Sequence, residues 1–194
     1  MTDEEQVHAE TRDAWRAWLE AHHGRSAGVW LVAWKKHTGR PGIPYDEAVE
    51  EAMCFGWVDS RPRRIDDDRT ALWFSPRRRG SAWSRSNKER VARMEAAGRM
   101  TDAGRAAVEA ARADGTWSML DEVEDLAVPP DLAAALATRP CAREQFDGFP
   151  RSTRRAILEW IAQAKRPETR AARVGETARL AERGERANQW RRPA

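Results

Sequence analysis

Side chains suited to ligand binding are concentrated in two short runs of the sequence. Residues 54–60 place Trp57 and Asp59 two positions apart, and residues 74–84 combine three consecutive Arg with Ser and Trp. Because side chains two apart on an extended chain point to the same face, Trp57 and Asp59 would share one face of a strand. An indole beside a carboxylate, with guanidinium and hydroxyl groups nearby, is typical of a site for a small aromatic or anionic ligand.

Walls and polar anchors for such a site would come from the neighbouring segments. Five Trp on the expected strands and the basic loop would form the walls, and Lys, Arg, Tyr and Asp side chains would anchor the ligand. Ser and Asn near the start of a helix would add donors, at a position that favours anions. The candidate binding residues are Trp30, Trp34, Lys35, Lys36, Tyr45, Trp57, Asp59, Trp73, Arg77, Ser81, Trp83, Ser84 and Asn87.

The same positions also have a purely structural interpretation. Trp57 can be a core side chain, Asp59 can hold Arg77 in an ion pair, and Ser84 or Ser86 can cap a helix. The sequence leaves both interpretations open.

Catalysis is a second possible function. Asp59 could act as a general acid or base, with Cys54 or Tyr45 assisting. The sequence contains no Ser-His-Asp order, no P-loop and no GxGxxG motif, and its four His lie near the start of the chain without a partner motif. We therefore favour a binding protein over an enzyme and leave the question of catalysis open.

Nucleic-acid binding is a third possible function, through the basic segment of residues 77–93. This segment combines seven Lys or Arg side chains with Trp83, which is available for stacking on bases. Residues 43–60 are acidic, so we expect the two segments to neutralise each other within the fold. A true nucleic-acid footprint should be an unpaired basic stripe, so this alternative ranks behind ligand binding.

Composition limits the class of protein and its compartment. Ten Trp and four Phe among 194 residues supply the large apolar groups that disordered chains lack. A charged fraction of 34% indicates a soluble protein, and no stretch is apolar enough for a signal peptide or a membrane span. The two isolated Cys predict neither a disulfide framework nor a zinc site. We expect a cytoplasmic protein with no metal and no cofactor.

Hydrophobic periodicity predicts helices and strands in the first part of the chain. Apolar residues fill both alternation phases of residues 28–36, which predicts a strand covered on both faces, and the period changes to two after Gly56. Expected helices span 14–22, 44–55, 86–97 and 101–113, and expected strands span 28–36, 57–60, 63–66 and 70–75.

These elements predict an α+β fold, with a small mostly antiparallel sheet packed by helices, in a domain of residues 1–120. From Pro129 onward the pattern is helical, with helices expected at 131–137, 143–146, 152–164 and 167–183. We therefore expect a C-terminal helical module over 129–184, preceded by an acidic connector and followed by a frayed basic tail over 185–194.

Several of these motifs together resemble a known family. They include Trp30-Leu31, Lys35-Lys36, Cys54-Phe-Gly-Trp-Val-Asp59, Phe74-Ser-Pro-Arg77, Ser81-Ala-Trp-Ser84 and Val128-Pro-Pro-Asp-Leu. In these motifs the chain is similar to the YdeI/OmpD-associated family, whose members are also labelled bacteriocin-protection proteins. It departs from the family at Ser60, where Gly is expected, and at Ser75, where Thr is usual.

The resemblance implies a role in stress or toxin protection and no established reaction. With the candidate site, it predicts a non-catalytic protein that binds a small aromatic or anionic molecule and protects against a toxin, an antibiotic or another stress. An enzyme that uses Asp59, and nucleic-acid binding through residues 77–93, remain the alternatives. No protein partner follows from the sequence.

Overall fold

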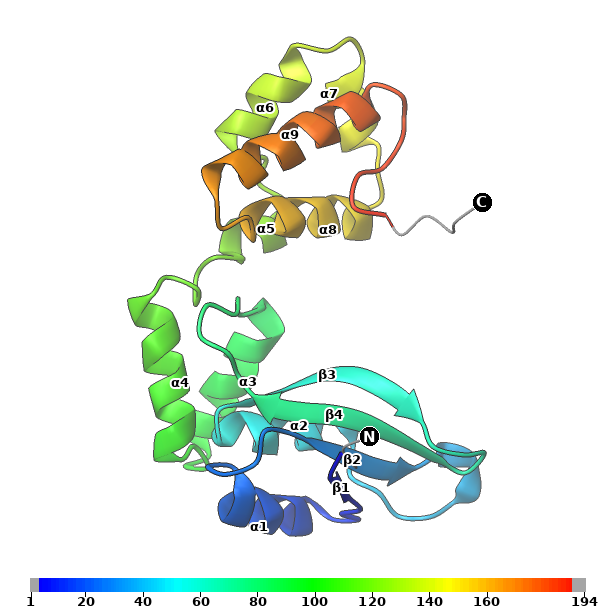
Figure 1. Ribbon diagram of the computed structural model, residues 1–194, viewed down its shortest axis with the longest axis vertical. Helices are drawn as coiled ribbons and strands as arrows, with labels where there is room; N and C mark the ends of the chain where they lie inside the picture. Colours follow the sequence, from blue (N-terminus) through cyan, green and yellow to red (C-terminus); the bar gives the residue numbers. More distant parts are fainter. Residues whose placement is uncertain (1–3, 190–194) are drawn as a thin grey trace. The chain divides into compact units, whose positions relative to one another are not determined.

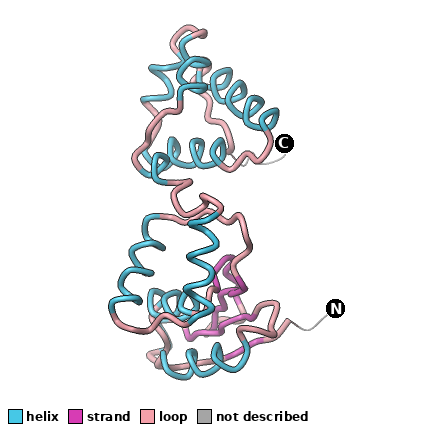
Figure 2. Tube along the Cα trace, turned by 90° about the vertical axis from the view of Figure 1, so that its left-hand side faces the viewer, coloured by secondary structure: helices cyan, strands magenta, loops and turns pink. Residues whose placement is uncertain are grey.

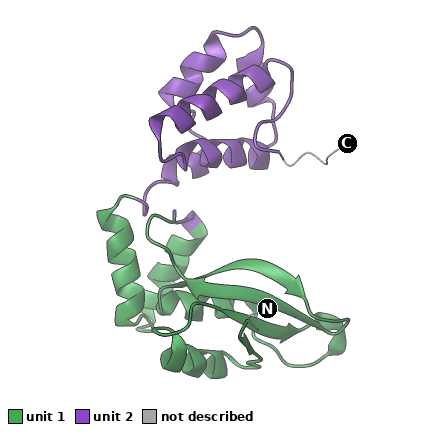
Figure 3. Ribbon diagram, in the orientation of Figure 1, with its two compact units in different colours: residues 1–81, 86–115 green, residues 82–85, 116–194 purple. Residues whose placement is uncertain are grey.

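The computed structural model (Figure 1) describes residues 4–189, which form two compact units. Unit 1 contains residues 1–81 and 86–115, and unit 2 contains residues 82–85 and 116–194 (Figure 3). Every strand of the described chain belongs to unit 1, whereas the described part of unit 2 consists of helices and loops (Figure 2). The expected α+β class is confirmed.

The sheet of unit 1 has the strand order β1-β2-β4-β3. Its strands are β1 (Gln6–Val7), β2 (Val29–Trp34), β3 (Trp57–Arg64) and β4 (Arg69–Pro76). β1 runs parallel to β2, whereas β4 pairs antiparallel with both β2 and β3. The mostly antiparallel sheet is therefore confirmed, and the two-residue β1 is an addition that no alternating pattern had indicated.

β3 is one strand, although the sequence predicted two pieces on either side of Pro62. The register of β3 against β4 shifts between Asp59 and Pro62, which marks a bulge. Proline has no N–H to donate and is confined to edge strands and bulges, and β3 is an edge strand. Pro62 thus marks a bulge rather than the end of a strand.

The helices α1 (Arg12–His22) and α2 (Tyr45–Cys54) pack against each other, and Figure 1 shows α1 below the strands. A 3₁₀ turn at Lys36–Thr38 follows β2, and α3 (Arg85–Ala96) and α4 (Asp102–Ala113) follow β4. The four helices that the sequence predicted in this region are present, each within a few residues of its expected bounds.

Aromatic side chains fill the space between the sheet and α1. Trp15 is fully buried, with its ring centroid 5.3 Å from that of Phe74 on β4, and its indole N–H donates to the carbonyl of Ala48 at 3.0 Å. Trp57 is also buried, and its indole N–H donates to the carbonyl of His23 at 3.3 Å. Because these indole N–H groups have acceptors, the rings add apolar burial without leaving an unpaired donor.

A buried carboxylate joins the helices of unit 1. Glu51 of α2 is completely buried and accepts hydrogen bonds from Arg12 at 2.6 Å, from Arg16 at 2.8 Å and from Arg99 at 2.8 Å. Burial alone would raise the pKa of Glu51, but the three guanidinium groups lower it below its ordinary value. This cluster was not predicted from the sequence, because the arginines that pair with Glu51 lie 35 to 48 residues away along the chain.

Unit 2 is a set of short helices around its own apolar core. Leu132, Phe146, Ile157 and Ile161 are buried together in this core. The helices are α5 (Asp121–Glu124), α6 (Pro130–Ala137), α7 (Ala142–Asp147), α8 (Arg151–Ala162) and α9 (Pro167–Ala181). All the helices expected from Pro129 onward are present, and α5 lies inside the segment that the sequence analysis treated as a connector.

Ala187 is buried in the core of unit 2, so the start of the expected tail is packed against the helices. The rest of that tail, residues 190–194 with Trp190, lies outside the described residues, as do residues 1–3.

Candidate functional site

The two faces of the sheet carry different side chains because successive residues of a strand point to opposite sides. On β2 and β4, Leu31 pairs with Leu72 on one face and Trp30 pairs with Trp73 on the other. We call the first the helix-facing side, since Trp15 of α1 packs on Phe74 there, and the second the tryptophan face.

Trp57 and Asp59 lie on the helix-facing side, two positions apart as the sequence analysis expected. Trp57 is only 2% exposed and belongs to the core, so its ring is not available to a ligand. Asp59 is partly exposed, and its Oδ2 accepts a hydrogen bond from the hydroxyl of Tyr45 at 2.9 Å. Partial burial, and then this hydrogen bond, raise the pKa of Tyr45 above its usual value.

Tyr45 and Asp59 line a groove between α2 and the helix-facing side. We call it the apolar groove; its volume is about 460 Å³. Most of its surface comes from apolar side chains of β2, β4 and the segment at the start of α2, among them Leu31, Ala33, Ile43, Leu72 and Phe74. Two predicted site residues therefore meet at one groove that is mainly apolar.

Arg77 follows β4 and interacts electrostatically with Asp59. Burial of the guanidinium lowers the pKa of Arg77 to about 10, and the negative charge of Asp59 acts in the opposite direction. Arg77 and Asp59, which the sequence suggested as a pair, are therefore linked by an electrostatic interaction.

On the tryptophan face, guanidinium groups stack on indole rings. Trp30 and Trp73 meet edge to face with centroids 5.2 Å apart, and the Arg61 guanidinium lies 5.2 Å from both centroids. The Arg63 guanidinium lies 4.1 Å from the Trp30 centroid. Glu4 accepts hydrogen bonds from the Trp30 indole and from Arg61, both at 2.8 Å, and these donors lower the pKa of Glu4. Such cation–π contacts hold both kinds of side chain in place.

A second groove opens beside these rings, and we call it the cationic groove. It has a volume of about 560 Å³. Its walls carry two guanidinium groups, three hydroxyl groups and one indole, contributed by Arg61, Arg78, Ser60, Ser75, Ser81 and Trp73. Trp73 and Ser81 were predicted site residues, Arg78 was predicted only as part of the basic segment 77–93, and Arg61 was missed. The alternation along β3 and the three consecutive Arg after β4 were the available signals.

The remaining residues around β2 have local partners. The guanidinium of Arg40 lies 4.2 Å from the Trp34 ring centroid, and the Trp34 indole donates to Glu10 at 3.0 Å. The ammonium of Lys35 donates to two carbonyl groups in the β3–β4 turn, at 2.7 and 2.9 Å, and thus holds that hairpin. Lys36 is exposed in the 3₁₀ turn. None of these residues lines either groove.

The last three predicted residues lie near the start of α3. Trp83 and Ser84 belong to unit 2, where Trp83 is 1% exposed and contacts Trp117 with centroids 5.1 Å apart. Asn87 belongs to unit 1 and accepts a hydrogen bond from Arg90 at 3.2 Å. Trp83 is thus a buried side chain of the helical unit.

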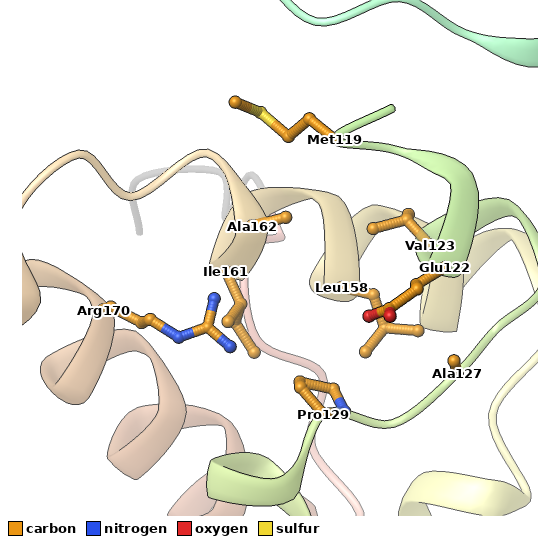
Figure 4. A pocket seen from close by; sticks show the side chains of 9 residues that line it. All are labelled: Met119, Glu122, Val123, Ala127, Pro129, Leu158, Ile161, Ala162 and Arg170. Carbon is orange, nitrogen blue, oxygen red and sulfur yellow. The ribbon is translucent and has the colours of Figure 1, made fainter. Parts of the chain in front are cut away.

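Unit 2 has a small pocket of its own (Figure 4). Leu158, Ile161 and Val123 contribute apolar side chains to a volume of about 230 Å³, and Glu122 and Arg170 lie on different sides of it. Asp131 accepts two hydrogen bonds from Arg170, at 2.7 and 3.0 Å, and Arg170 thereby lowers the pKa of Asp131. No residue of the sequence-predicted site lines this pocket.

Several arginines of the basic segment 77–93 form ion pairs with acidic side chains within their own unit. Arg90 pairs with Asp46 at 2.6 Å and Arg93 with Glu50 at 2.8 Å, both in unit 1. These acids lie in the acidic stretch of residues 43–60, so the two stretches neutralise each other in part, as expected.

The fold and the grooves together define the class: an α+β unit with two ligand-sized grooves on opposite faces of one sheet, in a chain that also carries a helical unit. Residues 7–107, more than half of the chain, match the family described as a domain of unknown function (DUF8412), and the chain belongs to this family. Residues 125–184 match the family described as "Bacteriocin-protection, YdeI or OmpD-Associated".

The resemblance to the YdeI/OmpD-associated family is therefore confirmed, and the matched residues lie in unit 2. The motifs of β2, β3 and β4 that suggested it lie within the region matched by the other family. Comparison with curated proteins found no match, and comparison with solved structures found none either. Within residues 4–189, no helix has the length and apolar character needed to cross a membrane.

Proposed function

We propose that unit 1 binds a small anionic ligand with an aromatic part, without catalysing a reaction, and that this binding serves protection against a toxin or a related stress. The observation that carries the proposal is the cationic groove, where guanidinium groups, hydroxyl groups and the indole of Trp73 line one volume of about 560 Å³. A few polar groups around an aromatic wall suit a ligand of this kind.

Arg78 is the main anion partner in this proposal. Its side chain is exposed and forms no salt bridge with any residue between 4 and 189. Arg61, by contrast, already shares its charge with Glu4 at 2.8 Å. A free guanidinium can bind a carboxylate, sulfonate or phosphate through two parallel hydrogen bonds, and Trp73 can stack on an aromatic ring.

The protective role draws on the family to which residues 125–184 belong, since its name refers to bacteriocin protection. Binding that removes a harmful small molecule from solution would give such a role without a reaction. The nucleic-acid alternative has weaker support because Arg90 and Arg93 are paired with acids. The enzyme alternative rests on Asp59, which lies at the apolar groove rather than at the cationic groove.

Calorimetric titration with two naphthalene derivatives of opposite charge tests the proposal. Naphthalene-1-sulfonate should bind, whereas 1-naphthylmethylamine, which has the same ring and a positive charge, should bind at least about tenfold more weakly. Arg78→Gln should weaken sulfonate binding about tenfold because it removes a charge-assisted bidentate contact.

Arg79→Gln is the matched control, because Arg79 is the next residue, is equally exposed and does not line the groove. It should leave sulfonate binding within about twofold of the unchanged protein. Equal losses in the two variants would reduce the effect to general attraction by net charge and would overturn the assignment to this groove. Equal binding of the two naphthalene derivatives would overturn the preference for anions.

A further inference from the structure

We infer that the apolar groove is a second, independent binding site, for an uncharged apolar ligand that donates a hydrogen bond from a hydroxyl group to Asp59. This site lies on the helix-facing side of the sheet. Ser60 lines both grooves, whereas the charged and aromatic groups of the cationic groove, Arg61, Arg78 and Trp73, do not line the apolar groove.

The side chains that line the apolar groove favour an apolar ligand. Leu31, Ala33, Leu72 and Phe74 come from adjacent strands of the sheet, and Ile43 comes from the segment that leads into α2. A volume of about 460 Å³ is in the range of pockets that hold small organic molecules. Apolar surface buried on binding would supply most of the affinity.

Asp59 is the polar group that fixes the orientation of the ligand. Its Oδ2 accepts a hydrogen bond from the phenol of Tyr45, whereas its Oδ1 accepts none from residues 4–189. A phenol is therefore already the kind of donor that this carboxylate accepts. The open oxygen lies at a groove that otherwise offers few polar groups, so a ligand hydroxyl would gain a charge-assisted hydrogen bond there.

Charge selects an uncharged donor over an ion. The negative charge of Asp59 repels an anionic ligand. Its attraction for a cation is reduced because it already interacts with the partly buried guanidinium of Arg77. A ligand ammonium would also lose its hydration in this apolar surrounding, whereas a hydroxyl loses much less.

Titration of the full chain with three naphthalene derivatives tests this inference. The probes are 1-naphthalenemethanol, 1-methylnaphthalene, which lacks the hydroxyl, and naphthalene-1-sulfonate. The alcohol should bind about five- to tenfold more tightly than the hydrocarbon, as expected for one net hydrogen bond to a charged group. At this groove the sulfonate should not compete with the alcohol.

Two variants locate the site. Asp59→Asn should weaken binding of the alcohol about fivefold and leave binding of 1-methylnaphthalene unchanged, because it replaces a charged acceptor by a neutral one. Ala33→Phe should abolish binding of both probes by filling the groove. Melting temperature and circular dichroism of Ala33→Phe establish that the variant is folded.

Asp46→Asn is the matched control, since Asp46 is an exposed acid in the first turn of α2, next to Tyr45, and does not line the groove. Equal affinities of Asp59→Asn and Asp46→Asn for the alcohol would overturn the role of Asp59. Unchanged binding of both probes by a folded Ala33→Phe variant would overturn the assignment of the binding site to this groove. Arg78→Gln should not alter binding of the alcohol, so failure of the anion site and failure of this site are distinguishable.

Discussion

The two faces of the sheet in unit 1 are built from alternate residues of the same strands, yet they differ in chemistry. The helix-facing side offers aliphatic side chains around Asp59, whereas the tryptophan face offers indoles stacked with guanidinium groups. Leu31 pairs with Leu72 and Trp30 with Trp73, so these two central pairs each join side chains of one kind. A register shift of one residue would bring unlike side chains together, so this pairing fixes the register.

The faces also differ in how they are held. A completely buried carboxylate, Glu51, fixes α1 and α2 against each other on the helix-facing side. On the tryptophan face, exposed groups such as Glu4 and Arg61 form the ion pairs. Buried pairs are costly to break and exposed pairs contribute little, so we expect the ion pairs of the helix-facing side to contribute more to stability than those of the tryptophan face.

The largest effect should come from Glu51→Ala. This change removes the carboxylate that three arginines share and leaves their charges uncompensated, which should lower the free energy of unfolding by about 3–5 kcal/mol. Urea unfolding followed by tryptophan fluorescence measures the change. Glu20→Ala removes only an exposed pair with Arg16 one helical turn away, and should cost less than about 0.5 kcal/mol.

The same variant has a pH signature. The pKa of Glu51 in the folded protein lies below its ordinary value of 4.5. Its contribution to stability is therefore complete above pH 4.5 and is lost as the pH falls through the lower folded pKa. The stability difference between the unchanged protein and Glu51→Ala should shrink in this acidic range. A difference that stays constant with pH would contradict the role assigned to the ionised carboxylate.

Much of the fold follows from periodicity in the sequence, and particular residues show where that reasoning ends. Residues 28–36 are apolar in both phases, and β2 is indeed buried on both faces. β1 has only two residues and pairs in parallel with β2, so no local pattern could reveal it. The burial of Glu51 depends on arginines 35 to 48 residues away, and a single sequence does not show such partners.

The candidate site, like the fold, has features that the sequence predicts and features that it does not. The spacing of Trp57 and Asp59 correctly predicts a shared face. Spacing does not reveal that Trp57 is covered by α1 while Asp59 reaches a groove, because that depends on where a distant helix packs. Trp73 immediately precedes Phe74 in β4, so the two side chains point to opposite faces of the sheet. Only the pairing of the strands shows which of these faces lies against the helices.

Gly28→Ala should have the second largest effect, and it acts on the tryptophan face. Gly28 has a φ of 154°, and a Cβ there would lie 2.2 Å from a ring carbon of Trp73. The ring would have to move, so we expect a loss of about 2–3 kcal/mol in unfolding free energy. Gly24→Ala, where a Cβ meets no atom within 4 Å, should stay within about 0.5 kcal/mol of the unchanged protein.

This variant separates the two grooves as well. Trp73 lines the cationic groove but not the apolar groove. Gly28→Ala should therefore weaken binding of naphthalene-1-sulfonate about tenfold and leave binding of 1-naphthalenemethanol unchanged. Calorimetry at a temperature well below the melting point of the variant measures both affinities. Equal losses for the two probes would mean that the faces do not act independently.

The smallest effect should come from Glu4→Gln, on the same face. Glu4 is exposed, so the free energy of unfolding should not change measurably. Its carboxylate accepts a hydrogen bond from Arg61 and partly neutralises the cationic groove. Removal of that charge should therefore raise the affinity for naphthalene-1-sulfonate about two- to threefold, an effect that 0.5 M salt should reduce. A lower affinity would instead show that Glu4 positions Arg61 for the ligand, and would make the N-terminal segment a part of the site rather than a competitor for it.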